Sequence, residues 1–449
     1  MRIESVRKIG HAVMVLGLML AAAAPSHAIP AFARKYGLPC SACHEAWPKL
    51  NSFGIAFRDN GYQLGNGRDA PIYQDPGYWP IALRMTPQWH RESRGPQPVD
   101  TVNGDGSGGQ MPGSITRSGF DISAVDFLTA GTLYKNVSFF HQSYFTTNGL
   151  FLAQMFIRFD NLLNSRWLNV KMGRFELDLP ISEERSLSID NTGGGYLNYH
   201  FRPPGDNNFF TGLGDAQVGV ELSGHSANSY TRYSLTMAGS GDGAANLSVN
   251  STYNVFANFT QGFEVPRLGL QRVGVYGYLG QSPTYFLTAG GAPISGTGTG
   301  NRSFYRTGAY GMWYLGKFDV STFFEHGQDN VYLGNAVPVT HPELLPPGAS
   351  GPTWNGGFAE AHYTYNPQLV FFSKYEVLRM ARQANTNIAR DLGNLDEWTI
   401  GYRWYPFMSS RAGLAWVQEY SHLKTPQAAP IFGTDEHKNS LMMGFDFDF

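Results

Sequence analysis

The chain has 449 residues, a formal net charge of −2 and only two cysteines. The near-neutral balance offers no basic excess for nucleic acid and no acidic solvating tail, so no nucleic-acid partner is expected. Two cysteines are too few for a soluble disulfide scaffold. Glycine (53 residues), Phe (31) and Tyr (24) are abundant, which is unusual for a secreted soluble enzyme, because glycine averages only about 7% of residues.

The N-terminal residues have the pattern of a secretory signal. Basic residues precede an apolar run from Ala12 to Ala24, which ends in Ser26-His27-Ala28. This order is typical of a cleaved signal peptide, so we expect residues 1–28 to direct export and to be removed. The run is shorter than the roughly 20 residues that a membrane-spanning helix needs, and no later run approaches that length.

Residues 29–78 form a second region, with short helical signals and several prolines. About fifty residues rarely bury enough core to fold alone, so this segment needs an additional source of stability. It contains both cysteines, in the stretch Cys40-Ser41-Ala42-Cys43-His44.

This stretch is the C-x-x-C-H haem-attachment pattern. The two thiols can form thioethers with the haem vinyl groups, and His44 can supply the proximal nitrogen to iron. A redox disulfide would be expected on a thioredoxin-like βαβ unit, and a zinc site would need further ligands at finger spacing. Neither context surrounds this motif. We therefore predict one covalent haem c, bound by Cys40 and Cys43 with His44 as proximal axial ligand, which also supplies the missing core.

The stretch FARKYGLPCSACHEAWPKLNSFGIAFRDNGYQL resembles the haem segment of the outer-membrane monohaem cytochrome c–porin fusions. That family includes bacterial Fe(II)-oxidising outer-membrane cytochromes. A basic residue often stands in the family at the position of Ile55. The resemblance implies a single c-type haem held at or inside a porin, which passes electrons across the outer membrane. The matching residues are Phe32-Ala33-Arg34 ahead of the motif and Pro48, Leu50, Asn51, Phe53, Gly54, Phe57, Gly61 and Tyr62 after it.

No spacing marks the sixth iron ligand. No methionine or histidine lies between His44 and Met85. Met85 and His90 lie on the first expected strand, on opposite faces if the strand is regular, and both residue types serve as axial ligands in cytochromes. They are the candidate distal ligands; ordinary strand side chains and an open or water-bound iron are the alternatives. The other histidines, such as His141, His200 and His326, carry no spacing signal.

From residue 79 onward the sequence changes to short alternating segments separated by Gly, Asn, Ser and Pro. In the last segment, residues 441, 443, 445, 447 and 449 are large and apolar, whereas the residues between them include Asp446 and Asp448. Similar alternation occurs at 216–222 and 397–404. A soluble β-sandwich would alternate too, but strands of about ten residues with aromatics near their ends favour a transmembrane barrel.

The candidate strands number seventeen, from 80–91 to 438–449. Removing 196–202, which lacks clean alternation, makes short periplasmic turns and longer outer loops alternate along the whole chain. We therefore predict an all-β outer-membrane barrel of about sixteen antiparallel strands over residues 79–449, with both ends periplasmic.

Two long connections remain. The stretch 92–116 is rich in Gly, Ser and Pro and is expected to be a mobile loop. The other, 175–214, becomes an outer loop able to fold inward as a constriction. Its acids include Glu176, Asp178, Glu183, Glu184 and Asp190. Acids such as Glu183, Glu184 and Asp190 could attract Fe(II), although a solvated loop is the simpler interpretation.

A haem outside the barrel could not bridge a bilayer about 40–45 Å thick, whereas a sixteen-stranded barrel has a wide lumen. We therefore expect residues 29–78 to plug the barrel within the lipid of the bacterial outer membrane. The leading hypothesis is electron transfer between an extracellular donor such as Fe(II) and a periplasmic carrier such as a soluble cytochrome c, which would make the chain an Fe(II):cytochrome c oxidoreductase. The alternatives are a transport porin with a structural or gating haem, and a haem peroxidase.

Overall fold

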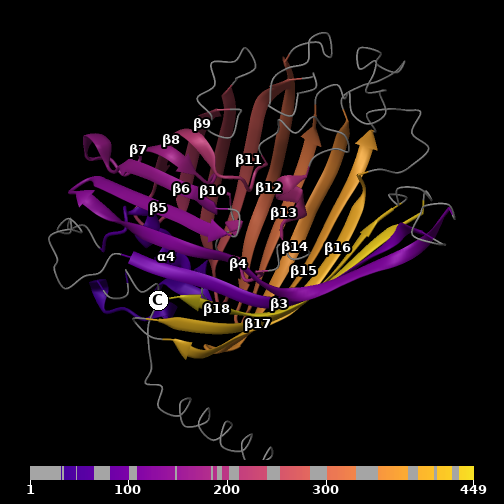
Figure 1. The fold of residues 1–449 in the computed structure, drawn as a ribbon. Helices are drawn as coiled ribbons and strands as arrows, with labels where there is room; N and C mark the ends of the chain where they lie inside the picture. The colour runs from indigo at the N-terminus through magenta and orange to yellow at the C-terminus, as the bar shows by residue number, and fades with distance from the viewer. Residues whose placement is uncertain are drawn as a thin grey trace, which may run out of the picture.

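The structure is a computed structural model in which the strands close into one barrel (Figure 1). It describes residues 32, 35–46, 48–64, 81–100, 109–146, 149–179, 181–183, 186–189, 195–201, 212–239, 253–283, 301–329, 352–382, 393–408, 412–426 and 434–448. The expected signal peptide, residues 1–28, lies outside these ranges, and its removal stays a prediction.

Sixteen antiparallel strands, β3 to β18, form the wall, and β18 pairs with β3 to close it. The predicted strand number is confirmed. The first strand begins at Ile81, close to the expected boundary at residue 79. The strands are β3 (Ile81–Asp100), β4 (Gln110–Tyr134), β5 (Val137–Thr146), β6 (Gly149–Phe159), β7 (Asn169–Phe175), β8 (Gln217–His225), β9 (Thr231–Gly239), β10 (Tyr253–Val265), β11 (Gly269–Pro283), β12 (Asn301–Leu315), β13 (Phe318–Gln328), β14 (Thr353–Asn366), β15 (Leu369–Arg382), β16 (Leu395–Met408), β17 (Gly413–Thr425) and β18 (Glu436–Asp448).

The connections alternate between the two ends of the barrel. The end that we call the turn end carries the connections 135–136, 160–168, 226–230, 266–268, 316–317, 367–368 and 409–412, together with the start of β3 and the end of β18. The opposite end is the loop end. The rejected segment 196–202 is not a strand, because its residues Leu197–His200 form the short helix α5. The turn 160–168 contains the 3₁₀ helix η2, Leu162–Asn164.

The alternation of apolar and polar residues in the sequence matches the outer and inner faces of the barrel wall. In β18, Met442 and Asp446 are fully buried, whereas Phe445 between them is 41% exposed. Cross-strand partners share a face, so the apolar residues of neighbouring strands form one outer surface and the polar residues line the lumen. Exposed apolar residues of that outer surface include Met155, Ile157, Val220, Leu235, Phe259, Val275, Phe324, Phe371, Ile400 and Trp404.

The expectation of a mobile loop over 92–116 is wrong for most of that stretch. Residues 92–100 and 110–116 extend β3 and β4, and they pair from Glu92↔Arg117 to Asp100↔Gln110. Figure 1 shows β3 and β4 as long purple strands that cross the front of the barrel. The sequence hides this extension because a strand beyond the lipid needs no apolar face, so the hydrophobic alternation stops while the backbone pairing continues. Residues 101–108 lie outside the described part of the chain.

The N-terminal segment, residues 32–64, contains α3 (Cys40–Cys43), β1 (His44–Ala46), β2 (Lys49–Leu50) and α4 (Ser52–Asp59). It lies against the inner wall near the turn end: Arg158 of β6 donates to the carbonyl oxygen of Arg58 at 2.8 Å, and Lys49 pairs with Asp319 of β13. None of the helices in the described ranges is long and apolar enough to cross a membrane.

The described parts of the 175–214 loop fold into the barrel. Tyr196 donates to Glu360 of β14 at 2.6 Å, and Asn198 donates to Glu376 of β15 at 2.8 Å. Leu187 and Tyr199 are 0% and 1% exposed. The expected inward fold of this loop is confirmed for these residues, and we call it the inward loop.

Candidate functional site

The Cys-x-x-Cys-His stretch forms one helical turn, α3, followed directly by β1. The thiol of Cys43 is half-buried and free of any disulfide. Burial raises the pKa of this thiol. The side chain of Cys40 lies outside the described residues, and its role stays a prediction.

His44 is buried, with 5% of its surface exposed. Its Nδ1 lies 2.9 Å from the carbonyl oxygen of Pro48. An Nδ1–H that donates to this carbonyl leaves the lone pair on Nε2, which is the tautomer that a metal-ligating imidazole needs. This contact orients the ring, and the role of His44 as proximal ligand stays a prediction. Among the described residues, no cluster of three or more His, Cys, Asp or Glu side chains is arranged to hold an ion without a porphyrin.

Asn51 and Gly54 allow α4 to pack closely against the motif. The side-chain amide of Asn51 donates to the carbonyl oxygens of Ser41 (3.2 Å) and Ala42 (3.0 Å), and its Oδ1 caps α4 by accepting from the Gly54 amide. A Cβ on Gly54 would lie 2.1 Å from the carbonyl oxygen of Cys43, so only glycine allows this approach. Both residues belong to the stretch that carries the family resemblance. The thiol, imidazole and close backbone support together suit a covalently attached haem c.

Aromatic side chains from the same stretch anchor the segment to the wall. Phe57 packs edge-on against Phe32 (5.1 Å between centroids) and Tyr36 (5.6 Å), and Phe32 stacks on Tyr62 at 5.3 Å. This cluster buries Ala130 of β4. It is an apolar core that the segment shares with the barrel, which a fifty-residue unit could not build alone.

Lys49 joins the segment to the opposite part of the wall. It pairs with Asp319 of β13 and with Glu45 at 3.2 Å, and it lies 2.9 Å from Nδ1 of His362 on β14. His362 in turn contacts Glu360. Burial would lower the pKa of Lys49, but Glu45 and Asp319 raise it above its usual value. The charged lysine therefore links the segment to the wall.

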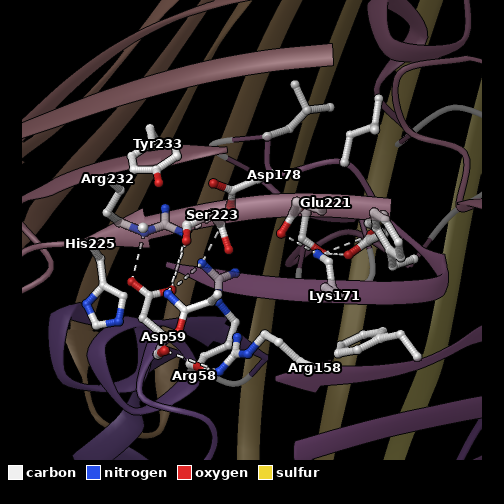
Figure 2. A pocket seen from close by; sticks show the side chains of 18 of the residues that line it. Arg58, Asp59, Arg158, Lys171, Asp178, Glu221, Ser223, His225, Arg232 and Tyr233 are labelled. Atoms are coloured by element: carbon white, nitrogen blue, oxygen red, sulfur yellow. Dashed lines mark hydrogen bonds and ion pairs between the residues drawn. The ribbon is translucent and has the colours of Figure 1, made fainter. Parts of the chain in front are cut away.

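Asp59, the last residue of α4, enters a second buried charge cluster (Figure 2). Its Oδ2 lies 2.8 Å from Nε of Arg232 on β9, and Arg232 also donates to Asp178 of the inward loop at 3.0 Å. Arg58 lies 3.7 Å from the same Asp178 carboxylate. Burial would raise the pKa of Asp59, but Arg232 and Arg58 hold it below its usual range. One arginine of the wall thus binds both the N-terminal segment and the inward loop.

A cavity of about 80 Å³ adjoins this cluster. Charged side chains of both signs line it, among them Arg158, Lys171, Asp178 and Glu221 (Figure 2). Lys171 and Glu221 are cross-strand neighbours on β7 and β8 and pair at 2.9 Å. A polar cavity of this size holds a few water molecules, and the balanced charges give it no preference for an anion or a cation.

The two candidate distal ligands face in opposite directions. Met85 pairs with Phe447, which is on the outer face of β18, whereas His90 pairs with the buried Met442. Cross-strand partners point to the same side of a sheet. Met85 therefore lies on the outer surface, and of the two only His90 faces the lumen.

The acids of the inward loop are engaged in ion pairs and hydrogen bonds rather than gathered into one site. Asp178 binds Arg232, Glu176 accepts from Ser182 at 2.9 and 2.7 Å, and Glu183 binds His200 at 2.6 Å. Glu184 and Asp190 lie outside the described residues.

His200 in α5 lies between Glu183 and Asp215, the latter at 3.3 Å. Burial would lower the pKa of His200, but hydrogen bonds to Asp215 and Glu183 raise it to about 10. His141 and His326 make ordinary strand contacts with Ser143 and Asn355.

Sequence reasoning missed Lys49, Asp59, Arg232 and His362. Strand alternation places the last two on the lumen face, but it does not pair them with the segment. The partners are 173 positions apart for Asp59 and Arg232, and 270 positions apart for Lys49 and Asp319. In the sequence, the only signal for these residues is a charge at a position expected to lie inside the barrel.

No protein-family model matches the sequence, and no curated protein is significantly similar to it. The outer-membrane channel DcaP of Acinetobacter baumannii has a similar fold, with 12% identity, a TM-score of 0.50, and 81% of this chain and 97% of that chain covered. The anion-selective porin from Comamonas acidovorans has 11% identity and a TM-score of 0.50 over 82% of this chain and 100% of that chain. These likenesses concern the barrel, so the haem segment of the expected family stays a prediction. They support a place in the bacterial outer membrane, and they show that the chain has the closed sixteen-stranded fold of outer-membrane porins.

Proposed function

We propose that this chain is a haem-carrying porin that transfers electrons across the bacterial outer membrane. In this proposal residues 1–28 direct export, residues 29–78 carry one covalent haem c, and residues 79–449 form the barrel. The turn end faces the periplasm, because outer-membrane barrels have short turns on that side.

The observation that carries the proposal is the imidazole of His44. It is buried directly behind the thiol pair, and Nδ1 at 2.9 Å from the Pro48 carbonyl favours the iron-binding tautomer. A histidine with a structural role alone would not require the two thiols beside it.

When bound, the haem would supply a one-electron redox centre. The chain's own residues hold its attachment point in the lumen: Asn51 and Gly54 support the motif, and Asp59 and Lys49 fasten the segment to the wall. This position shortens the distance that an electron must cross through a bilayer about 40–45 Å thick. His90 faces the lumen and is the candidate sixth ligand.

A donor on the loop side, Fe(II) or another reductant, and a soluble periplasmic carrier on the turn side would complete the path. The alternative is a transport porin with a structural or gating haem. The fold likeness to the DcaP channel and to an anion-selective porin favours that alternative, whereas the two segments held in the lumen by buried ion pairs favour a closed conduit.

The test begins with mass spectrometry of the purified, processed chain, for which we expect one added porphyrin on the Cys40–Cys43 peptide. Redox titration and stopped-flow mixing with Fe(II) would follow, with conductance in planar bilayers measured in parallel. Rapid haem reduction with low conductance supports the conduit. High conductance that depends on haem, without donor oxidation, supports the porin. A chain with no porphyrin adduct would end the haem proposal altogether.

A further inference from the structure

The turn end carries an uneven distribution of charge. Lys135 lies in the β4–β5 turn, Arg166 in the β6–β7 turn, Arg267 in the β10–β11 turn and Lys317 in the β12–β13 turn. Lys135, Arg267 and Lys317 are exposed, and Arg166 is half-exposed. These four cations, which we call the rim cations, follow the arc of the rim from β4 to β13.

The described turns contain no exposed acid. Asp160, the only acid of those turns, is 1% exposed and pairs with Arg158 at 2.6 Å. Glu264, near the end of β10, is exposed and accepts a hydrogen bond from Tyr230. The described part of the rim thus presents an excess of positive charge, on a chain whose formal net charge is −2.

The segment that carries the Cys-x-x-Cys-His motif lies near the same end. The N-terminal segment contacts wall residues beside the turns, namely Asp160 and Asp319. Next to the motif, Ser41, Ser52 and Phe53 are exposed, and Phe53 keeps 45% of its surface accessible. An exposed apolar side chain beside the motif, near an arc of cations, has the make-up of a transient protein-docking surface.

We propose that the turn end is the docking surface for an acidic, soluble electron-carrier protein of the periplasm. The rim cations steer the partner and orient it, and Phe53 lies at the contact beside the motif. Electrostatic attraction of this kind raises association rates and weakens with salt. The role of the partner rests on the proposed electron transfer, but the surface itself does not.

Anionic lipid headgroups could also attract the rim cations. Lipid, however, surrounds the outside of the wall, whereas Phe53 belongs to the segment inside it. Only a body that covers the mouth of the barrel can touch both the rim cations and Phe53, which favours a protein.

The test uses one probe protein in two charge states: basic cytochrome c, and the same protein after succinylation of its lysines, which makes it acidic. Binding to the full chain in nanodiscs of zwitterionic lipid is measured at low and at high salt. We expect the acidic form to bind and the basic form not to bind. The triple variant Lys135→Glu, Arg267→Glu, Lys317→Glu should weaken binding of the acidic form by about tenfold or more at low salt.

Lys424→Glu is the matched control. Lys424 is an exposed cation at the loop end, paired with Asp435 at 2.7 Å, and its reversal should leave probe binding unchanged. Phe53→Ser should speed dissociation of the acidic probe without changing the salt dependence. Equal binding of the acidic probe to the wild type and the triple variant would overturn the proposal. So would a triple variant that loses only its affinity for anionic vesicles, which would assign the rim cations to lipid.

The variant Cys40→Ala/Cys43→Ala lacks the haem-attachment thiols. Docking needs no haem, so this variant should still bind the acidic probe, which separates this inference from the proposed function. If the acidic probe binds with full salt dependence but exchanges no electrons even with the wild type, the surface stands and the proposed function fails. If electrons pass equally fast from the wild type and from the triple variant to the acidic probe, the function stands and this inference fails.

Discussion

Asp59 of α4 and Arg232 of β9 form a buried ion pair with 2.8 Å between Oδ2 and Nε. The side chains are 7% and 14% exposed. Because Arg232 also binds Asp178, the pair fastens the N-terminal segment and the inward loop to the wall at one point.

Replacing Arg232 with Met should therefore loosen both elements. Removing one partner of a buried pair leaves an uncompensated charge and costs about 3–5 kcal/mol. We expect a lower free energy of unfolding in a urea titration of the chain folded in lipid vesicles, faster proteolysis of residues 32–64 and a higher conductance. Lys424→Ala removes one partner of an exposed pair and should cost less than about 1 kcal/mol. Equal effects of the two substitutions would show that the buried cluster does not hold the N-terminal segment and the inward loop to the wall.

Gly54→Ala tests the contact between α4 and the motif. The added Cβ would meet the carbonyl oxygen of Cys43 at 2.1 Å, so α4 must shift, and overpacking of this kind costs about 1–3 kcal/mol. We expect less stable protein and less covalent haem per chain. Gly119→Ala is the matched control, because nothing lies within 4 Å of its added Cβ. Normal stability and haem content in Gly54→Ala would contradict the close approach.

His44→Ala separates attachment from ligation. Cys40 and Cys43 should still carry the porphyrin by mass spectrometry, whereas the visible spectrum should change because the proximal nitrogen is lost. Met85→Ala should leave the spectrum unchanged, since Met85 lies on the outer face with Phe447. An unaltered spectrum in His44→Ala, or an altered one in Met85→Ala, would show that the ligand is misassigned.

The inward loop should loosen at high pH. His200, held by Glu183 and Asp215, has its pKa raised to about 10 from an ordinary value of 6.5. A raised pKa in the folded state stabilises the loop fully below about pH 6.5, and the effect is lost as the pH rises through about 10. We expect conductance to increase between pH 8 and pH 10.5. In His200→Gln this increase should be absent, and the conductance should already be higher at pH 7. If the variant shows the same rise in conductance as the wild type, another titrating group causes it.

Much of the barrel is predictable because one face of each strand meets lipid and the other meets polar groups. The period of two in β18 or β16 is therefore visible in the sequence, and the alternation of turns and loops exposed 196–202 as a false strand. The same logic failed for 92–116, where the strands leave the lipid and the apolar signal ends although the pairing continues.

Local sequence alone determined the Cys-x-x-Cys-His spacing and the two faces of each strand, because both patterns act over a few residues, and the order of turns and loops along the chain then determined the strand count. Only the tertiary structure decided which charges meet inside the barrel. Lys49 finds Asp319 and Asp59 finds Arg232 because closing the sheet brings distant strands around one segment, and a buried charge must find a partner wherever the closed wall supplies one.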